Sequence, residues 1–272
     1  MRHALFYQVM QNSAAKISSE FISIQRDKIK DLGIGLPDLR SGSKSNLTDL
    51  TPALLASYID ATYLSPPFSS QTVEELCDFA LEYSCASVCI PPYFVPLIKK
   101  RLENSSVNVC SVADFPFGSG STAIKVASIK TLVDQGCDEV DFVINYSEFI
   151  ESHAIQNTFE QLGKIREAAP KTCLKAIIET SYLKPADIIA LCALLDAAHI
   201  DYAKTSTGFS QTGASVDNIA LMHAASSENL KLKASGGIGD ITFAQALIAA
   251  GANRLGTSKA KHLISQLKKE VQ

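Results

Sequence analysis

Short apolar runs alternate with longer amphipathic segments along most of the chain, and this alternation begins at Leu47. The short runs are rich in Val, Ile and Ala and predict strands buried on both faces. Their ranges are 57–62, 86–90, 107–113, 139–145, 173–179, 201–205, 231–235 and 253–257. Between them, apolar residues three and four positions apart predict helices. The helical ranges are 72–83, 94–102, 122–135, 155–168, 185–198, 216–225 and 243–250. Strands and helices therefore alternate, as in parallel α/β proteins.

The number of strand–helix units separates two parallel architectures. Eight units predict an α/β fold of the (β/α)8 TIM-barrel class, which typically needs about 250 residues. The alternative is an open doubly wound sheet, which usually has fewer strands and a glycine-rich first turn that is missing here. The segment Gly118-Ser119-Gly120-Ser121-Thr122 lacks the Gly-Lys-Ser/Thr ending of a phosphate loop. We interpret it as a helix N-terminus and expect a closed barrel.

The first 46 residues differ from the rest of the chain. Apolar residues at helical spacing occur within residues 1–30 and include Phe21 and Ile24, and a glycine- and serine-containing run over residues 33–46 follows. The segment lacks the continuous apolar region of a secretory signal. We therefore predict an N-terminal extension with no catalytic role over residues 1–46 and a barrel over residues 47–272.

Composition and charge exclude several classes of function. Hydrophobic residues make up 46% of the chain and charged residues 19%, which describes a globular protein with a large core. The formal net charge is −3 and no basic stripe is visible, which argues against nucleic-acid and membrane-surface partners. No stretch approaches the roughly 20 apolar residues of a membrane span. We expect a cytoplasmic protein.

Cysteine and histidine usage bears on redox state and on metals. The seven cysteines are scattered and form no C-x-x-C pair, so we predict reduced, buried thiols. The five histidines form no H-E-x-x-H or other recognisable ligand cluster. We therefore expect neither a catalytic metal held by the protein nor a cofactor.

Two lysines end neighbouring predicted strands, and small residues and glycine follow each of them. Lys204 precedes Thr-Ser-Thr-Gly, and Lys233 precedes Ala-Ser-Gly-Gly about one strand–helix repeat later. Burying a lone ammonium is costly, and a neutral lysine amine attacks carbonyl carbons to form Schiff bases. Either lysine alone would suggest a solvated strand end. The pair in equivalent positions favours a catalytic role.

Further polar residues occupy the predicted carboxyl ends of other strands, where barrels carry their active sites. Those that we consider candidates for the site are Asp60, Thr62, Cys89, Asp141, Lys175 and Glu179. The alternative is a network of Asp141, Glu179 and the three lysines that merely fills the barrel. Since buried ion networks seldom stabilise a fold more than apolar packing does, we favour catalysis.

Glycines and a serine in three loops predict a phosphate site. Gly208 follows the sixth predicted strand, Gly236 and Gly237 follow the seventh, and Ser258 follows the eighth. Barrel enzymes commonly bind phosphate through backbone N–H groups in the last of these loops. Each glycine alone is more often a turn residue, so the prediction depends on their occurring together.

These motifs together resemble the deoxyribose-phosphate aldolase family from about residue 47 onward. The segments that carry the resemblance are Ile59-Asp60-Ala61-Thr62, Val88-Cys89-Ile90, Asp114-Phe115-Pro116-Phe117-Gly118, Asp138-Glu139-Val140-Asp141, Leu174-Lys175-Ala176-Ile177-Ile178-Glu179-Thr180, Lys204-Thr205-Ser206-Thr207-Gly208, Lys233-Ala234-Ser235-Gly236-Gly237 and Gly256-Thr257-Ser258. The two lysine motifs are the most specific of them.

The resemblance implies a class I aldolase that reversibly cleaves 2-deoxyribose 5-phosphate into glyceraldehyde 3-phosphate and acetaldehyde. It implies that Lys204 forms the Schiff base, that Lys233 perturbs the pKa of its neighbour, and that Asp141 transfers protons. Gly208, Gly236, Gly237 and Ser258 would then line the phosphate site. The sugar phosphate is the expected partner, and a homodimer or higher homo-oligomer is left open.

Three departures from the family pattern stand out. The extension has no counterpart in short members, and Ala61 occupies a position that is often His or Leu. The sequence ends in Val271-Gln272, without the C-terminal tyrosine that some members use in proton transfer. Two alternatives remain: another Schiff-base barrel such as a transaldolase, which would lack this lysine pair, and a non-catalytic sugar-phosphate-binding barrel, which would need neither Asp141 nor both lysines.

Overall fold

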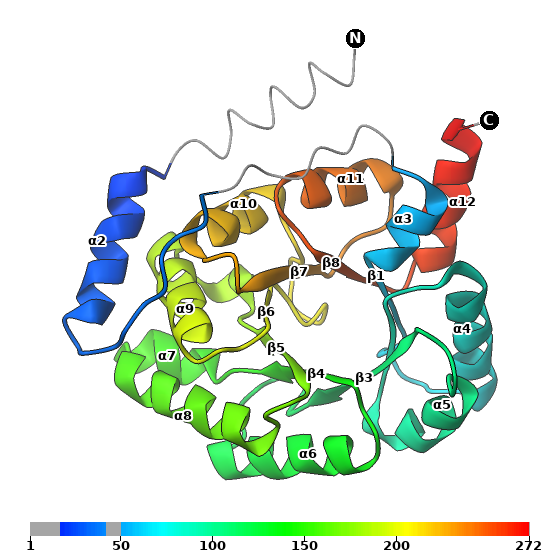
Figure 1. Cartoon of the computed structure of the whole chain (residues 1–272), viewed down its shortest axis with the longest axis horizontal. Coiled ribbons are helices and arrows are strands. Elements are labelled where there is room, and N and C mark those ends of the chain that lie inside the picture. The colour runs from blue at the N-terminus through cyan, green and yellow to red at the C-terminus, as the bar shows by residue number, and fades with distance from the viewer. Residues whose placement is uncertain (1–16, 42–49, 272) are drawn as a thin grey trace.

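Eight parallel strands close into a barrel in chain order, as the sequence predicts (Figure 1). The computed structural model describes residues 17–41 and 50–271. The strands are β1 (Ile59–Thr62), β2 (Ser87–Ile90), β3 (Asn108–Ala113), β4 (Glu139–Val143), β5 (Cys173–Ile177), β6 (Tyr202–Lys204), β7 (Lys231–Ser235) and β8 (Arg254–Thr257). Since β8 pairs with β1, the described sheet has no open edge, and the open-sheet alternative is excluded.

Helices surround this barrel on the outside (Figure 1). Those in the predicted ranges are α4 (Ser70–Tyr83), α5 (Val95–Arg101), α6 (Thr122–Asp134), α8 (Ile155–Ala168), α9 (Pro185–Ala197), α10 (Val216–Ala225) and α11 (Ile241–Ala249). Elements without a predicted counterpart are α3 (Pro52–Ser57), η2 (Pro92–Phe94), α7 (Tyr146–Ser152), η3 (Thr180–Tyr182) and α12 (Ala260–Val271). The barrel prediction is therefore confirmed, although these five elements were missed and several predicted elements differ at their ends.

Side-chain caps explain why several helices begin where they do. Ser69, Ser121, Ser215 and Asp240 each accept a hydrogen bond from a backbone N–H in the first turn of the following helix. The Ser121 hydroxyl accepts from the Ile124 N–H at 3.4 Å. The segment from Gly118 to Thr122 therefore leads into the N-terminus of α6, as predicted.

The barrel has two kinds of interior. Between strands and helices the side chains are apolar, and Val88, Val140 and Leu174 are completely buried there. Inside the barrel the alternation of strand residues instead presents charged side chains, including Asp141 and Lys175, which are also completely buried. A core of this kind is costly unless every charge is paired, so its arrangement has to be accounted for.

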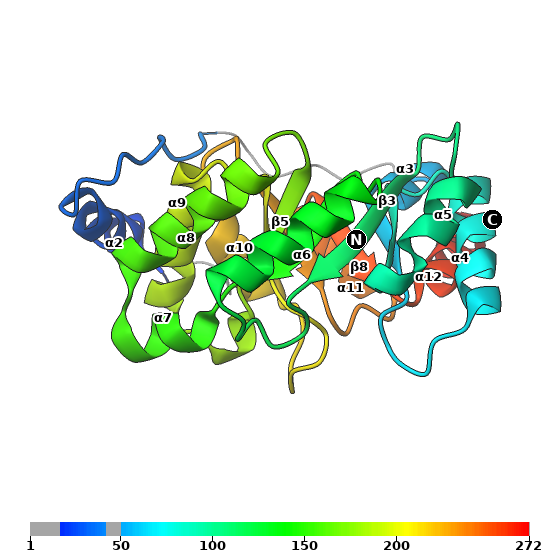
Figure 2. The same cartoon turned by 90° about the horizontal axis from the view of Figure 1, so that it is seen from below.

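The loops that follow β1 and β6 project from the same face of the molecule. Figure 2 shows both from the side, with the β1–α4 loop in cyan and the β6–α10 loop in yellow. Because all strands run in parallel, this face carries their carboxyl ends. It is the face where a barrel of this class holds its active site.

Part of the N-terminal extension packs against the outside of the barrel. Helix α2 (Ser19–Lys30) contacts α9 and α10, and Figure 1 shows it in blue outside the ring of helices. Its buried face is formed by Ile22, Arg26 and Ile29. Phe21 and Ile24, which the sequence analysis took as part of the helical apolar pattern, are instead 37% and 48% exposed.

Two arginines fasten the extension to the barrel through backbone carbonyls. Arg26 donates from Nη1 to the Ala225 carbonyl at 3.0 Å, and its burial lowers its pKa. Arg40 donates from Nη2 to the carbonyls of Ser227 at 2.6 Å and Leu230 at 2.7 Å. These oxygens lie at the end of α10 and in the turn before β7, so the extension satisfies polar groups that a helix end leaves without partners.

The sequence of α9 explains why a cover is needed at this place. Its residues from Ile188 to Asp196 are all buried, and apolar side chains occur all round the helix. A helix that is apolar on every side needs neighbours on every side. The barrel supplies one neighbour and α2 supplies another.

Two predictions for the N-terminal part of the chain concern residues that the structure does not describe. The predicted boundary between residues 46 and 47 and the helical pattern over residues 1–16 lie outside the described residues.

Within residues 17–41 and 50–271, no helix combines the length and the hydropathy that a membrane span requires.

Two substitutions on α2 test whether the extension stabilises the barrel without taking part in its chemistry. Ile29→Ala leaves a cavity against α9 and α10, and we expect it to lower the free energy of unfolding by about 2–4 kcal/mol. Ile24→Ala changes an exposed residue of the same helix and should cost less than about 0.5 kcal/mol. Chemical denaturation measures both values. Turnover per folded molecule should be unchanged in both variants, and a tenfold loss in either would show that the extension acts on the active site.

Candidate active site

The Asp141 carboxylate on β4 is the centre of the charged interior. Its Oδ1 accepts a hydrogen bond from Lys175 Nζ at 2.9 Å. Its Oδ2 accepts from Lys204 Nζ at 2.8 Å and from Lys233 Nζ at 2.6 Å. One carboxylate thus gathers the ammonium groups of three successive strands, β5, β6 and β7.

The strand register makes this convergence possible. Asp141 pairs with Lys175 across β4 and β5, and Lys204 pairs with Lys233 across β6 and β7. Neighbouring strands lie about 4.8 Å apart, so side chains in paired positions point into the barrel side by side. The two lysines that the sequence analysis placed at equivalent strand ends are therefore direct neighbours.

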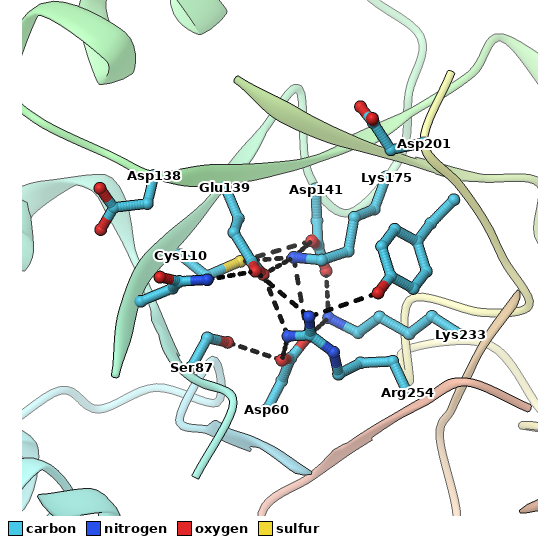
Figure 3. Close-up of polar contacts among 12 residues, drawn as sticks. Asp60, Ser87, Cys110, Asp138, Glu139, Asp141, Lys175, Asp201, Lys233 and Arg254 are labelled. Atoms are coloured by element: carbon cyan, nitrogen blue, oxygen red, sulfur yellow. Dashed lines mark hydrogen bonds and ion pairs between the residues drawn. The ribbon is translucent and has the colours of Figure 1, made fainter. Parts of the chain in front are cut away.

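Two more carboxylates and an arginine complete the set. Figure 3 shows Asp60 and Glu139 beside Lys175, Lys233 and Arg254. Asp60 Oδ2 lies 2.5 Å from Lys233 Nζ, and Glu139 Oε2 lies 2.5 Å from Lys175 Nζ. Arg254 bridges the two acids through Nη1, at 2.5 Å from Asp60 and 3.3 Å from Glu139. We call these seven residues the ion cluster: Asp60, Glu139, Asp141, Lys175, Lys204, Lys233 and Arg254.

The ion cluster contains three carboxylates and four cations, and the pKa shifts follow from their proximity. Burial alone would raise the pKa of Asp60 and of Asp141, but the surrounding cations outweigh burial and lower both values. Burial likewise would lower the pKa of Lys175 and of Lys233, but the attraction of Asp141 raises both. These four groups are therefore charged at neutral pH.

A cavity of about 370 Å³ opens at the carboxyl ends of the strands. Lys204 lines it, together with Thr62 and Leu64 from the β1 side. Lys175 and Lys233 are completely buried and do not line it. Of the three lysines gathered by Asp141, Lys204 is therefore the one that a ligand in this cavity would meet.

The far wall of the cavity consists of the predicted phosphate loops. Gly208, Gly236, Gly237 and Ser258 all line the same cavity as Lys204. Gly236 has φ +87°, and a Cβ there would come within 2.9 Å of the Cα of Gly213. The β6 and β7 loops therefore touch backbone to backbone, and only glycines fit at this contact.

Glu179 plays a different part from the one considered in the sequence analysis. The predicted strand 173–179 ends at Ile177, and Glu179 has φ +53° in the left-handed region. Its Oε2 accepts from the Thr207 N–H at 3.1 Å and from the Thr207 hydroxyl at 2.6 Å. Its Oε1 accepts from the Ser210 hydroxyl at 3.0 Å. Among the described residues it forms no ion pair, so it braces the β6–α10 loop and does not belong to the ion cluster.

The remaining candidates lie around the cluster. The Thr62 hydroxyl donates to the Asp60 carbonyl at 2.8 Å while the residue lines the cavity. Cys89 is completely buried and packs with Cys110 and Val112. All seven cysteines are free thiols.

Sequence analysis missed four residues that help to build the site. Glu139 and Arg254 belong to the ion cluster, Gly213 supports Gly236, and Lys259 lines the cavity beside Ser258. Glu139 shares a strand face with Asp141, which is a signal that alternation provides. Arg254 lies at the start of β8, where a search confined to the carboxyl ends of strands does not look.

Comparison with known proteins agrees with this geometry. The model of the DeoC/LacD family aldolases matches residues 54–259. The deoxyribose-phosphate aldolase of Mycoplasmoides pirum is 40% identical over 213 residues, which cover 77% of this chain and 96% of that protein. The corresponding enzyme of Treponema denticola is 38% identical over 213 residues, with coverage of 78% and 98%.

Solved structures give the same result. A candidate deoxyribose-phosphate aldolase from Coccidioides immitis has a TM-score of 0.79 at 33% identity, covering 93% of this chain and 99% of the other. The deoxyribose phosphate aldolase of Aeropyrum pernix has a TM-score of 0.75 at 27% identity, with coverage of 81% and 93%. On its sequence, its barrel and its gathered lysines, the chain belongs to the DeoC/LacD family of aldolases.

Proposed function

We propose that this protein is a class I deoxyribose-phosphate aldolase, which reversibly cleaves 2-deoxy-D-ribose 5-phosphate into D-glyceraldehyde 3-phosphate and acetaldehyde. One observation carries the proposal: Lys204 contacts Asp141 at 2.8 Å and also lines a cavity that it shares with Gly236, Gly237 and Ser258. The amine of Lys204 and the glycine-rich loops thus line one space. The identity to named deoxyribose-phosphate aldolases supports the same substrate.

The charge balance of the ion cluster supports Lys204 as the Schiff-base residue. The cluster holds one more cation than carboxylates, so the release of one proton makes it neutral. Attraction to the carboxylates raises the pKa of Lys175, Lys233 and Arg254, which keep their protons. Lys204 is the lysine of the cluster that lines the cavity, so it is the one placed to meet a carbonyl substrate.

Lys233 contributes to the site through its position. Lys204 and Lys233 contact the same oxygen of Asp141, at 2.8 and 2.6 Å, which brings their nitrogens close together. Two ammonium charges about 5 Å apart repel by about 3.3 kcal/mol at an effective dielectric of about 20. The role that we assign to Lys233 is therefore electrostatic, because its ammonium acts on Lys204 across this short separation.

The reaction then follows from the chemistry of imines. The Lys204 amine adds to the C1 aldehyde of the open-chain sugar, and loss of water leaves a protonated imine. The C3 hydroxyl loses its proton, the C2–C3 bond breaks, and its electron pair forms an enamine with the imine carbon. Glyceraldehyde 3-phosphate leaves, C2 of the enamine gains a proton, and water releases acetaldehyde and the free amine.

Asp141 is the group we assign to proton transfer around the imine. It lies within hydrogen-bond distance of Lys204, which general acid–base catalysis requires. The cations around Asp141 hold it as a carboxylate, so it acts by orienting a water or hydroxyl that exchanges protons with the reacting carbons. Asp60, Lys175 and Cys89 are assigned supporting positions around this centre, and Thr62 lies where the sugar would pass.

The phosphate is assigned to the wall formed by Gly208, Gly236, Gly237 and Ser258. Gly208, Gly236 and Gly237 have positive φ values of +88°, +87° and +75°. Because glycine has no side chain, the backbone at these positions can approach a ligand closely. Lys259 is an exposed cation that lines the same wall. Glu179 holds the β6–α10 loop that carries Gly208, so we assign it a supporting role in this wall.

Assembly and location are assigned on indirect support. The Aeropyrum pernix enzyme is described as tetrameric, which supports a homo-oligomer for this chain. Seven free thiols fit the reducing cytoplasm. The partner of the barrel itself is a small sugar phosphate, and no metal or cofactor is needed for imine chemistry.

Removing the amine tests the proposed activity directly. Purified protein should cleave 2-deoxyribose 5-phosphate, with acetaldehyde and glyceraldehyde 3-phosphate detected in equal amounts. Lys204→Met should lower the rate by at least about 10³-fold, because no other described lysine lines the cavity near Asp141. Lys130→Met, which changes an exposed lysine on α6, should leave the rate unchanged. A Lys204→Met enzyme that keeps a tenth of the activity would contradict the assignment.

A second pair of substitutions separates phosphate binding from chemistry. Ser258→Asp places a like charge beside the phosphate, so KM for the phosphorylated sugar should rise at least about tenfold while kcat changes little. Ser258→Ala, the uncharged control, should raise KM by less than about threefold. Turnover of unphosphorylated 2-deoxyribose should be insensitive to both.

Lys233→Leu should behave differently from Ser258→Asp and lower kcat on both sugars, because Lys233 acts on the imine step. Its folded fraction is checked by circular dichroism, since removing one partner of a buried ion pair can cost about 3–5 kcal/mol.

If Ser258→Asp lowers the turnover of the phosphorylated and the unphosphorylated sugar equally, the phosphate binds elsewhere.

A further inference from the structure

Two cysteines and the central carboxylate converge at the base of the site. Cys89 on β2 and Cys110 on β3 are paired positions of neighbouring strands. Their Sγ atoms and a carboxylate oxygen of Asp141 all lie within 4.8 Å of one another, and all three residues are buried. The Cys110 thiol donates to Asp141 Oδ1 at 3.4 Å. None of the steps proposed for the aldol reaction uses this pair of thiols.

We propose that Cys89, Cys110 and Asp141 form an inhibitory binding site for a thiophilic divalent cation such as Zn²⁺ or Cd²⁺. Two sulfurs and one carboxylate are a ligand set that zinc and cadmium favour, and Mg²⁺ and Ca²⁺ do not. Tetrahedral zinc with Zn–S near 2.3 Å and Zn–O near 2.0 Å holds its ligand atoms roughly 3.5–3.8 Å apart. The three atoms here need only small side-chain shifts to reach that spacing.

The charges of the surroundings are compatible with such a cation. Binding a divalent cation while two thiol protons leave adds no net charge to the interior, so the cluster keeps its balance. Lys175 Nζ lies 3.3 Å from Cys110 Sγ and can stabilise a thiolate there.

The ligands stand on rigid elements and can be reached from the cavity. All three come from strands of the closed barrel, which hold ligands more precisely than loops do. Leu64 packs on Cys89 and Cys110, and it also lines the cavity that contains Lys204. Leu64 therefore contacts both the cavity and the pair of cysteines, and it connects the cavity with the proposed site.

Inhibition is expected because the cation would occupy the Asp141 carboxylate. The Asp141 oxygen that accepts from Cys110 is Oδ1, which also accepts from Lys175. A metal bound to Oδ1 would displace Lys175 and withdraw negative charge from the carboxylate whose Oδ2 holds Lys204 and Lys233. This consequence rests on the proposed aldolase function, whereas the binding site itself does not. The seven cysteines are scattered along the sequence, and the register of β2 with β3 brings these two together.

Cadmium provides a probe with two independent signals. The reduced, chelator-treated protein is titrated with CdCl₂ while the ultraviolet charge-transfer band of cadmium–thiolate bonds and the cleavage of 2-deoxyribose 5-phosphate are followed. We expect one tightly bound cadmium per chain, loss of activity in parallel with the band, and recovery of activity with EDTA. MgCl₂ should do neither.

Three variants assign the signal to the proposed ligands. Cys110→Ser and Cys89→Ser should each raise the cadmium concentration at half-saturation of the band by at least about tenfold. Cys173→Ser, which removes a partly exposed thiol on β5, should leave the titration unchanged. Each variant is compared with its own cadmium-free rate, so a loss of basal activity does not obscure the result.

The outcomes distinguish this proposal from the proposed function. Absence of the band, or a band that survives in both Cys110→Ser and Cys89→Ser, overturns the site. A cadmium band that appears without any fall in aldolase activity overturns its inhibitory role. If the protein cleaves no 2-deoxyribose 5-phosphate at all, the proposed function fails, and the band and its dependence on the two cysteines still decide the site.

Discussion

The Asp141 carboxylate is the constraint on which the interior of this barrel depends. Three lysines from three strands contact it at 2.6–2.9 Å, and each of them would be costly to bury without it. Asp60, Glu139 and Arg254 extend the pairing to the other side of the barrel. Of the three lysines, Lys204 also lines the cavity, so the same carboxylate that pairs the buried charges positions the amine that a ligand would meet.

The fold follows from the sequence pattern, and Asp141, Lys175, Lys204 and Lys233, which the sequence analysis placed on inward strand faces or at strand ends, lie together inside the barrel. Eight apolar runs at regular spacing predicted the barrel, and the Lys204 and Lys233 motifs predicted neighbouring strand ends. Glu179 shows where this reasoning fails: alternation continued past Ile177 would place it beside Lys175, but the backbone turns into the left-handed region at Glu179. Strand ends depend on such local turns, which apolar periodicity does not report.

The missed residues share a physical reason. Arg254 enters the cluster from the opposite end of a strand, because its long side chain reaches two carboxylates from the start of β8. The pairing of Cys89 with Cys110 depends on the register of β2 and β3, which a single sequence does not specify. The helical periodicity that includes Phe21 and Ile24 does lie on a helix, α2, but the buried face of α2 is formed by Ile22, Arg26 and Ile29 instead.

The central claim is that Lys204, and neither of its two neighbours on Asp141, carries the covalent intermediate. Borohydride reduction during turnover of 2-deoxyribose 5-phosphate, followed by peptide mass spectrometry, measures this directly. The account predicts a stable two-carbon adduct on the peptide that contains Lys204, since acetaldehyde is the fragment held as the imine. An adduct confined to Lys175 or Lys233 would contradict it.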